Sequence, residues 1–510
     1  MPRLTDYTSK ADAERHFSGA ALWDLFDGNR DGLNITHECI DRWAGDPERI
    51  AIQIAYEDGH HEALTFADLS DWASRFAHWL NHEGVRPGDR VAIMLEPSLA
   101  FYAALFGTMK HGAVAVPLFT LFGPDGVRLR VDDCHPVLLL TTAEKQAAIG
   151  TLPATRIIVP DDLFMSDLER FQGPFKTDTA AAAMALYQYT SGTTRDLPAA
   201  VKHTHRAIVV VSVAALYGTG IRPGDRFFCP SSPAWGHGLW HGTLAPLALG
   251  VQTGTISGRF DPDRLAAALS GLRINNLSAA ATHYRMMKNA TVARYPLTLE
   301  KMTFTGEPVD SETLAFAETH YDTRLCSMYG TTEVGVILAD FPGAADYQPR
   351  AGSLGKPVPE LKVTVQAADG SLCLPGQIGE IKVWRHGEWL STKDRGRTDE
   401  DGYFWHEGRA DDVIISAGWT IGPAEVEDAI MKHPAVREAA VIGVPDPVRG
   451  QIVKAFVTAQ ETVGLREEIQ ELVRTRLSQH EYPRLIEFVS ELPKTPAGKV
   501  NRKILREKKT

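Results

Sequence analysis

The sequence predicts an α/β protein with a large N-terminal domain, made of two doubly wound α/β subdomains and a small β unit, and a small α+β C-terminal domain. From about residue 65 to 340, short apolar, β-branched runs alternate with helical patterns. This alternation is typical of parallel strands covered by helices on both faces. Beyond about residue 350, glycine and proline separate the strand patterns, which indicates an antiparallel unit.

Four apolar runs are predicted strands of the N-terminal region. They are RVAIML at 90–95, AVAVPL at 113–118, VLLLTT at 137–142 and RIIV at 156–159. One fragment recurs, as VRPGDRVAIM from Val85 and as IRPGDRFFCP from Ile221. Each copy has Pro-Gly-Asp between a helical stretch and a strand, as where a helix ends and the chain enters a sheet. Two similar subdomains explain the repeat, and so does chance recurrence of a turn sequence.

The C-terminal domain is predicted to begin near the charged step 409–412, so that the domains span 1–410 and 411–510. A strand is expected at 413–416, and a helix is expected after Pro423, because proline suits the first helical position. The segments AAVIGV, VKAFVTA and LIEFV are further strands, and the amphipathic stretch 465–479 is a further helix. Together they form a compact α+β unit.

Composition excludes several classes of protein. The net charge is −11, with Lys and Arg scattered, which argues against a nucleic-acid partner. The cysteines are widely separated without CxxC spacing, which indicates neither a zinc ribbon nor a disulfide framework and favours a reducing cytoplasm. The charged N-terminus does not resemble a signal peptide, and no run reaches the roughly 18 apolar residues of a membrane span. We therefore expect a soluble cytoplasmic protein; its oligomeric state is not indicated.

A hydroxyl-rich loop, TSGTT, follows a predicted strand that ends at Tyr189. Its glycine lets backbone N–H groups approach an anion, and the hydroxyls add donors, which is how a phosphate is held. It is not a Walker loop, because GxxxxGK[ST] is absent. Taken alone, it also fits an ordinary surface turn. The candidate phosphate-binding residues are Thr190, Ser191, Gly192, Thr193 and Thr194.

Three further motifs carry candidate ligand-binding groups. In LCSMYGTTEVGV (325–336), a carboxylate beside hydroxyls suits Mg²⁺ shared with nucleotide phosphates. In 391–414, Asp394 is an acceptor for a ribose diol and Arg409 a forked donor for phosphate. Near the C-terminus, Lys499 follows a Pro-Ala-Gly turn and is a point charge suited to a developing negative centre. Each motif, taken alone, also fits a solvated turn or tail.

The order of these motifs along the chain resembles the adenylate-forming superfamily, most of all its acyl-CoA synthetases and, within them, the medium-chain-like group. The resemblance covers nearly the whole chain. It implies an enzyme that uses ATP, Mg²⁺ and coenzyme A: a carboxylate attacks the α-phosphate to give an acyl-adenylate, and the CoA thiol then releases AMP. The protein then contributes positioning and charge neutralisation.

The resemblance also implies residue roles. Thr190 to Thr194 would lie along the phosphates. Thr332 would contact a phosphate, and Glu333 would interact with both phosphate and Mg²⁺. Lys499 would be the catalytic lysine. The adenine would be bordered by Gly306, Glu307, Pro308 and Tyr329, next to Gly330. Asp394 would bind the ribose and Arg409 the nucleotide. The mobile C-terminal domain would rotate about Asp411, and CoA would meet Ser416, Ala417, Gly418 and Arg449.

The chain departs from the family pattern in three places. Arg195 and Asp196 stand where the phosphate loop has its second glycine, and Ala199 replaces the lysine after the proline. Our hypothesis is that Arg195 or Lys202 supplies the missing cation. Lys393 stands where Thr-Gly-Asp has glycine, and Thr420 where relatives often carry a basic residue.

The resemblance implies that the substrate is a small carboxylic acid. The resemblance makes Trp235, Gly236 and His237 the residues that shape its pocket, and they suggest a medium-chain, branched or ring-bearing acid. His237 and His241 have helical spacing suited to zinc but lack a third ligand, so zinc is the weaker interpretation. Two alternatives stay open: transfer to a carrier-protein thiol in place of CoA, and a catalytically weakened nucleotide-binding homologue.

Overall fold

The computed structural model describes residues 2–189, 200–288, 290, 295–306, 309–331, 334–385, 387–409, 412, 414–416, 419–446, 449–477, 481–495 and 498–507. The chain forms two compact units. The first comprises Met1–Phe304, His320–Cys326 and Phe341–Tyr347, and the second comprises Thr305–Thr319, Ser327–Asp340 and Gln348–Thr510. None of the helices in these described stretches combines the length and apolar character needed to cross a membrane.

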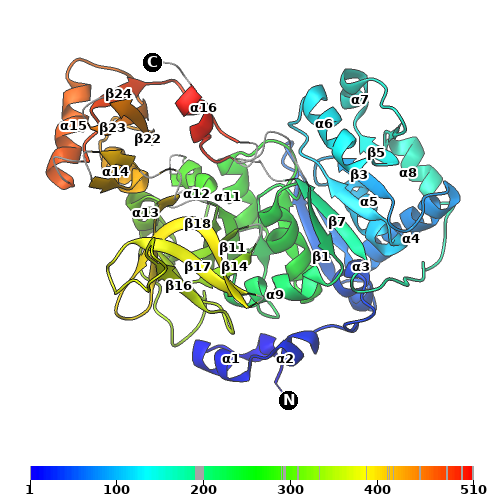
Figure 1. Ribbon diagram of the computed structural model, residues 1–510. Coiled ribbons are helices and arrows are strands. Elements are labelled where there is room, and N and C mark those ends of the chain that lie inside the picture. The colour runs from blue at the N-terminus through cyan, green and yellow to red at the C-terminus, as the bar shows by residue number, and fades with distance from the viewer. Residues whose placement is uncertain are drawn as a thin grey trace. The chain divides into compact units, whose positions relative to one another are not determined.

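One sheet of the first unit has the strand order β6-β5-β3-β4-β7-β8 (Figure 1). Its strands are parallel apart from β8, which forms an antiparallel hairpin with β7. The strands are β3 (Arg90–Met94), β4 (Val114–Pro117), β5 (Leu138–Thr141), β6 (Arg156–Ile158), β7 (Met184–Tyr189) and β8 (Ala200–Thr204). The helices between them are α4 (Phe66–His82), α5 (Leu99–His111), α6 (Pro124–Cys134), α7 (Ala143–Ile149) and α8 (Asp162–Leu168). The four strands predicted from apolar runs are confirmed.

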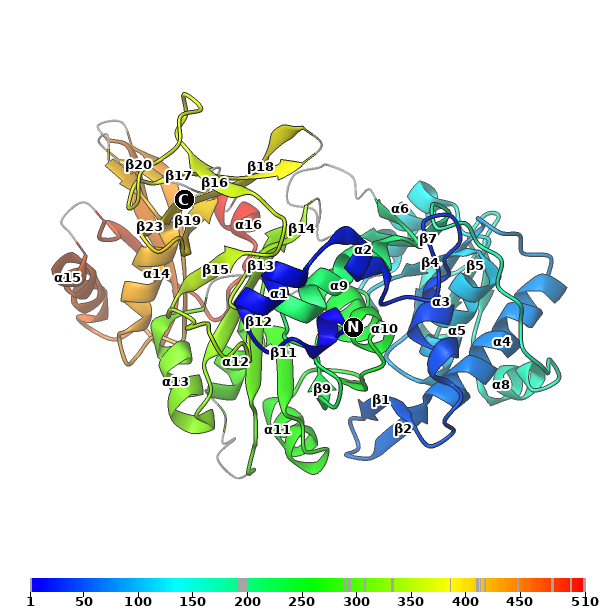
Figure 2. The ribbon, with the colours of Figure 1, turned by 90° about the horizontal axis from the view of Figure 1, so that it is seen from below.

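A second set of strands in this unit has the order β12-β11-β9-β10-β1-β2 (Figure 2). Strands β10 and β11 run parallel to β9, and β1 and β2 form an antiparallel hairpin at the end. The strands are β1 (Ile50–Ala55), β2 (His61–Thr65), β9 (Phe227–Phe228), β10 (Thr253–Ile256), β11 (Asn276–Ala280) and β12 (Lys301–Thr305). The helices along it are α9 (Ala207–Tyr217), a π-helical segment (His237–Leu244), α10 (Ala245–Ala248), α11 (Pro262–Gly271) and α12 (Ala281–Lys288). N-terminal to it lie α1 (Lys10–His16), α2 (Gly19–Trp23) and α3 (Ile35–Cys39).

The two sets of strands share one arrangement, and the repeated sequence fragment occupies the same place in both. In each, a central strand follows the fragment and is flanked by two parallel strands, with an antiparallel hairpin at one end. Asp89 accepts a hydrogen bond from the backbone N–H of Arg86 at 2.9 Å, and Asp225 accepts one from Arg222 at 3.0 Å. The glycine of each copy has a positive φ, 86° and 92°. The fold therefore supports similar subdomains over chance as the source of the repeat.

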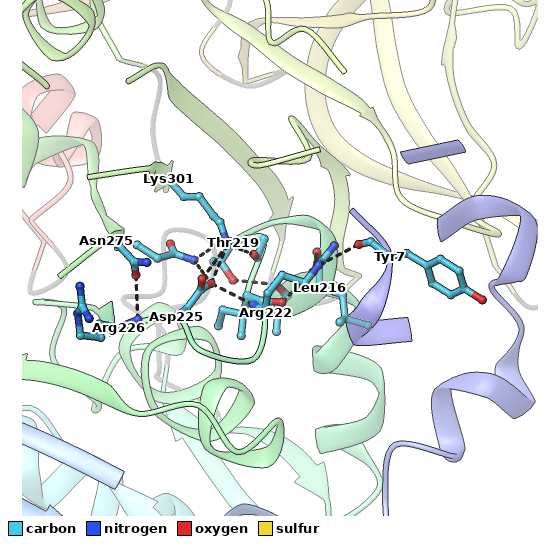
Figure 3. A network of polar contacts seen from close by, with 12 residues as sticks. Tyr7, Leu216, Thr219, Arg222, Asp225, Arg226, Asn275 and Lys301 are labelled. Atoms are coloured by element: carbon cyan, nitrogen blue, oxygen red, sulfur yellow. Dashed lines mark hydrogen bonds and ion pairs between the residues drawn. The ribbon is translucent and has the colours of Figure 1, made fainter. Parts of the chain in front are cut away.

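The second copy of the turn is the centre of a polar network (Figure 3). The Asp225 carboxylate accepts from Lys301 Nζ at 2.8 Å and from Asn276 Nδ2 at 3.0 Å, so β9, β11 and β12 meet at one buried charge. The Arg222 guanidinium donates to the carbonyl of Tyr7 at 3.1 Å. The network therefore fixes the start of β9 and ties the N-terminal segment to the same unit.

The second unit contains an antiparallel sheet, as the glycine- and proline-rich sequence predicts. Its neighbouring strands pair in the order β16-β17-β18-β19-β15-β14-β13, every pair antiparallel. The elements are α13 (Ser311–Tyr321), β13 (Leu325–Thr331), β14 (Gly335–Ala339), β15 (Ser353–Pro357), β16 (Val363–Gln366), β17 (Gly379–Arg385), β18 (Glu388–Thr398) and β19 (Phe404–Arg409). Its core is formed by side chains such as Ile337, Leu338, Ile381, Val383 and Phe404.

A second sheet in this unit has the order β21-β20-β23-β22, with β24 parallel to β23. Its elements are β20 (Ile414–Ser416), β21 (Trp419–Ile421), α14 (Pro423–Met431), β22 (Glu438–Asp446), β23 (Gly450–Thr458), α15 (Leu465–Arg476), β24 (Leu485–Phe488) and α16 (Arg502–Glu507). Pro423 is the first residue of α14, as predicted. The predicted domain boundary at 410/411 falls between the two sheets of this unit and stays a prediction.

Candidate active site

Two side chains from the antiparallel sheet of the second unit contact Asp394. The Tyr329 hydroxyl donates to Asp394 Oδ2 at 2.6 Å, and His406 Nε2 lies 3.6 Å from Oδ1. Asp394 is 5% exposed, so its carboxylate depends on such neighbours in place of water. Tyr329 and Asp394 were predicted to border the nucleotide, and the fold brings them into direct contact. His406 was not singled out from the sequence.

Arg409 is placed next to Asp394 by strand pairing. The two residues are Cα partners in the register of β18 and β19, although they are 15 positions apart in the chain numbering. A carboxylate predicted to bind ribose and an arginine predicted to bind the nucleotide therefore lie on adjacent strands.

At two glycines that were predicted to lie near the nucleotide, the backbone geometry disfavours any residue with a side chain. Gly306 has φ +98°, a conformation that side-chain-bearing residues rarely adopt. A Cβ on Gly330 would lie 1.9 Å from the carbonyl oxygen of Gly335, where β13 and β14 shift register. The predicted break at Gly330 is therefore real, but it is a bulge inside a hairpin, and β13 continues to Thr331.

Lys393 adopts the backbone conformation of the glycine that it replaces. Its φ is +62°, in the left-handed region. The Ser391 hydroxyl accepts from its N–H at 3.0 Å, and the Thr392 hydroxyl accepts from the N–H of Asp394 at 3.2 Å. The turn that presents Asp394 is thus kept despite the loss of glycine.

Lys499 is presented by a tight hairpin. The N–H of Thr495 donates to the Lys499 carbonyl at 2.7 Å, the N–H of Gly498 donates to the Thr495 carbonyl at 2.8 Å, and Gly498 has φ +80°. Buried Leu492 and Leu505 on either side pack with β22 and β23. The predicted catalytic lysine therefore stands on a short, well-anchored loop.

Two residues predicted to meet CoA lie on neighbouring strands of the C-terminal sheet. Ser416 on β20 is 3% exposed and is the Cα partner of Gly450 on β23. Arg449 directly precedes that glycine, and its N–H donates to Asp446 Oδ1 at 2.8 Å. The fold brings Ser416 and Arg449 together from positions far apart in the sequence.

The residues predicted for the acid lie in the first unit, at the start of the π-helical segment. His237 is buried, with Nδ1 3.0 Å from the Ser231 hydroxyl and Nε2 2.9 Å from the Ser278 hydroxyl. The Trp235 ring lies 5.4 Å from the His237 ring in an edge-on contact. Because both ring nitrogens meet hydroxyls, His237 is not arranged as a zinc ligand. Among the described residues, no group of three or more His, Cys, Asp or Glu side chains could hold a metal.

Gly236 adjoins Gln188, a glutamine that was not predicted as a site residue from the sequence. A Cβ on Gly236 would lie 3.4 Å from Oε1 and 3.6 Å from Nε2 of Gln188, which is on β7. Trp240 Nε1 donates to Gln188 Oε1 at 3.1 Å, and the Trp240 ring meets His203 of β8 edge-on at 4.9 Å. Strand alternation around the phosphate loop was the signal that would have drawn attention to Gln188 and His203.

Several predicted site residues lie outside the described residues. For Arg409 the backbone alone is described. Lys202, one candidate for the missing cation, has its ammonium 5.0 Å from the ring centre of Tyr187, its partner across the hairpin. The predicted residues outside the described part are Thr190, Ser191, Gly192, Thr193, Thr194, Arg195, Glu307, Pro308, Thr332, Glu333, Asp411, Ala417 and Gly418.

Comparison with known proteins identifies the family of this chain. The AMP-binding enzyme model matches residues 40–390, and the model of the AMP-binding enzyme C-terminal domain matches residues 425–499. The chain is similar to the acetyl-coenzyme A synthetase of Bacillus subtilis (strain 168), at 31% identity over 96% of this chain and 93% of that one.

Two solved structures are similar over almost the full length. A Brucella canis acyl-CoA synthetase is 31% identical with a TM-score of 0.76, covering 98% of each chain. The anthranilate CoA ligase AuaEII, in complex with anthranoyl-AMP, is 25% identical with a TM-score of 0.84, covering 96% of this chain and 98% of that one. The chain belongs to the AMP-binding enzyme family and is an acyl-CoA synthetase of the adenylate-forming superfamily, as its motifs imply.

Proposed function

We propose that this enzyme activates a medium-chain, branched or ring-bearing carboxylic acid with ATP and transfers the acyl group to coenzyme A. The observation that carries the proposal is the contact between Tyr329 and Asp394, with Arg409 as the Cα partner of Asp394. A fixed carboxylate acceptor beside an arginine suits a ribose diol next to a phosphate. The anthranilate ligase, whose structure contains the adenylate of a ring-bearing acid, supports the substrate class.

In the first half-reaction, an oxygen of the acid attacks the α-phosphorus of ATP. The bond from that phosphorus to the β-phosphate oxygen breaks, and pyrophosphate leaves. Lys499 would neutralise charge that develops on the acid and α-phosphate oxygens, while Asp394 and Tyr329 hold the nucleoside. The hydroxyl loop Thr190 to Thr194 would donate to the phosphates, and Thr332 would assist it.

In the second half-reaction, the CoA sulfur attacks the acyl carbon, the bond to AMP breaks, and the thiol proton goes to solvent. Ser416 and Arg449 would contact CoA. Arginine is a forked donor suited to the phosphates of CoA. The domain of residues 411–510 would turn about Asp411 between the two halves.

Glu333 is the residue proposed to hold Mg²⁺. A single carboxylate together with phosphate oxygens is a donor set that magnesium commonly uses. When bound, Mg²⁺ would neutralise phosphate charge. We further propose that the enzyme acts in the cytoplasm.

The proposal is tested with the full-length protein, ATP, Mg²⁺, CoA and a panel of acids. We expect pyrophosphate release that depends on the acid and an acyl-CoA product of matching mass. A holo-carrier protein in place of CoA tests the alternative acceptor. Absence of pyrophosphate release with every acid would contradict the proposal and favour a nucleotide-binding protein without catalysis.

A further inference from the structure

A buried amide in the first unit has its oxygen paired, whereas its nitrogen has no partner among the residues that the structure describes. Gln188 is 3% exposed, and its Oε1 accepts from the indole N–H of Trp240 at 3.1 Å. Because an indole N–H can only donate, this contact identifies the oxygen and leaves Nε2 as the other end of the amide. No hydrogen-bond partner of Gln188 Nε2 exists among the described residues.

A second polar atom that has no partner in the described part of the chain belongs to a residue on the same face of the hairpin. Leu186 is the Cα partner of His203, and Gln188 is the partner of Val201, so Gln188 and His203 are diagonal neighbours on one face of β7 and β8. Diagonal neighbours are roughly 7–8 Å apart along the backbone, which is within reach of long and aromatic side chains such as these two. His203 Nε2 is buried and also lacks a partner in the described part of the chain.

The surroundings orient both groups. Trp240 covers this face, since it donates to Gln188 and its ring meets the His203 ring at 4.9 Å. Gly236 lies beside the Gln188 amide and adds no side chain there. Burial lowers the pKa of His203 to about 4, so at neutral pH the ring is uncharged and one of its two nitrogens carries a free lone pair.

From these contacts, and resting on the proposed function, we infer that the acid substrate carries a hydroxyl group, which Gln188 and His203 bind together. A hydroxyl oxygen accepts from the Gln188 amide while its proton is donated to His203 Nε2, so one small group satisfies both atoms. Gln188 stands two residues before the predicted phosphate loop, and Gly236 belongs to the predicted acid pocket. A methyl group in the same place would leave a buried donor without a partner.

The first experiment uses the unmodified enzyme and pairs of acids in which a methyl group replaces the hydroxyl. Suitable pairs are 4-hydroxybutanoate with pentanoate, and 2-, 3- and 4-hydroxybenzoate with the corresponding methylbenzoates. The kcat/KM values are measured by pyrophosphate release and confirmed by acyl-CoA mass. In at least one pair we expect the hydroxy acid to be preferred by about 10- to 100-fold, the usual effect of one or two buried hydrogen bonds.

The second experiment uses variants and compares the hydroxyl-to-methyl ratio of kcat/KM for the best pair. His203→Phe keeps a ring against Trp240 but removes Nε2, and Gln188→Met removes the amide at similar length. Each is expected to lower the ratio about 10-fold or more. The control is Thr204→Val, because Thr204 lies on the opposite face of β8 from His203 and should leave the ratio unchanged.

The outcomes separate the two proposals. If every methyl analogue is used as well as its hydroxy partner, the inference about the hydroxyl group is overturned while the ligase function stands. If the preference exists but neither variant lowers it, Gln188 and His203 do not bind the hydroxyl group of the substrate, and the inference fails as well. If no acid releases pyrophosphate, the proposed function itself fails and the inference fails with it.

Discussion

At the scale of single residues, Lys393 replaces the glycine that the motif pattern expects, yet its backbone keeps the left-handed conformation that favours glycine. A left-handed conformation costs a residue with a Cβ about 1–2 kcal/mol, and glycine adopts it freely. Glycine in turn loses roughly 0.5–1 kcal/mol through its greater freedom in the unfolded chain. We therefore expect Lys393→Gly to stabilise the protein by about 0.5–1 kcal/mol.

Urea unfolding that is followed by circular dichroism measures this change. Lys393→Val is the opposing variant, because a β-branched side chain is most strongly excluded from φ +62°. It should shift the midpoint to lower urea concentration. Equal midpoints for the glycine and valine variants would show that the turn is not strained.

Asp394 offers a test that identifies its ligand atom by atom. If its carboxylate binds a ribose hydroxyl, 3′-deoxy-ATP or 2′-deoxy-ATP should lower kcat/KM by about 10-fold or more in the unmodified enzyme. In Asp394→Asn the same analogue should cost much less, because one partner is already altered. If the losses in kcat/KM caused by the variant and by the deoxy analogue are simply additive, Asp394 does not bind that hydroxyl and has another role, for example holding Tyr329.

The phosphate loop raises the question of which cation replaces its missing lysine. Lys202 lies on β8 with its ammonium near the Tyr187 ring, and Arg195 stands in the loop itself. We expect Arg195→Ala, Lys202→Ala or both to raise the KM for ATP by about 10-fold, as expected when a charged phosphate contact is lost. Initial rates over a range of ATP concentrations measure this, with Lys176→Ala as a control on the same unit. The hypothesis is wrong if both variants keep the normal dependence on ATP.

At the scale of elements, the sequence predicts strands and helices well where local patterns decide them. The apolar runs of β3, β4, β5 and β6 and the proline that starts α14 are such cases. Contacts that depend on register were not predictable. His406 comes within 3.6 Å of Asp394 only because β18 and β19 pair as they do, and Gln188 meets Trp240 only because a π-helical segment covers the hairpin.

The hairpin that carries Lys499 also carries Lys494, so the loss of each lysine can be compared. Lys499→Ala should lower the rate of adenylate formation by about 10²–10³, the usual effect of losing one group that stabilises a developing charge. Thioester formation from a supplied acyl-adenylate and CoA should change little. Lys494→Ala is the matched control. Lys494 lies on the same hairpin as Lys499, and its Nζ forms an ion pair with Glu438 Oε1 of β22 at 2.6 Å. Unchanged adenylation in Lys499→Ala would contradict the proposed mechanism.

At the scale of the whole molecule, the first unit repeats one arrangement and the second does not. The strand order β6-β5-β3-β4-β7-β8 corresponds to β12-β11-β9-β10-β1-β2, and the shared Pro-Gly-Asp turn starts the central strand of each. In both halves the parallel strands need helices on both faces, which explains why their sequence runs are short and continuously apolar. The antiparallel sheets of the second unit instead supply the paired strands that align Asp394 with Arg409 and Ser416 with Gly450.

The proposed rotation of residues 411–510 gives the last prediction, because it separates the two half-reactions. Proline at position 411 would fix φ near −65° and remove an N–H, which restricts a hinge without changing any group proposed to touch substrate. We expect Asp411→Pro to change either adenylation or thioester formation by at least 10-fold while leaving the other near its normal rate, because a restricted hinge favours one pose. Rapid-quench measurement of pyrophosphate and acyl-CoA in a single turnover distinguishes the steps. Asp411→Ala, which keeps a flexible backbone, should affect both steps little. If the proline variant slows both steps equally, or neither, rotation about this residue does not govern the change between half-reactions.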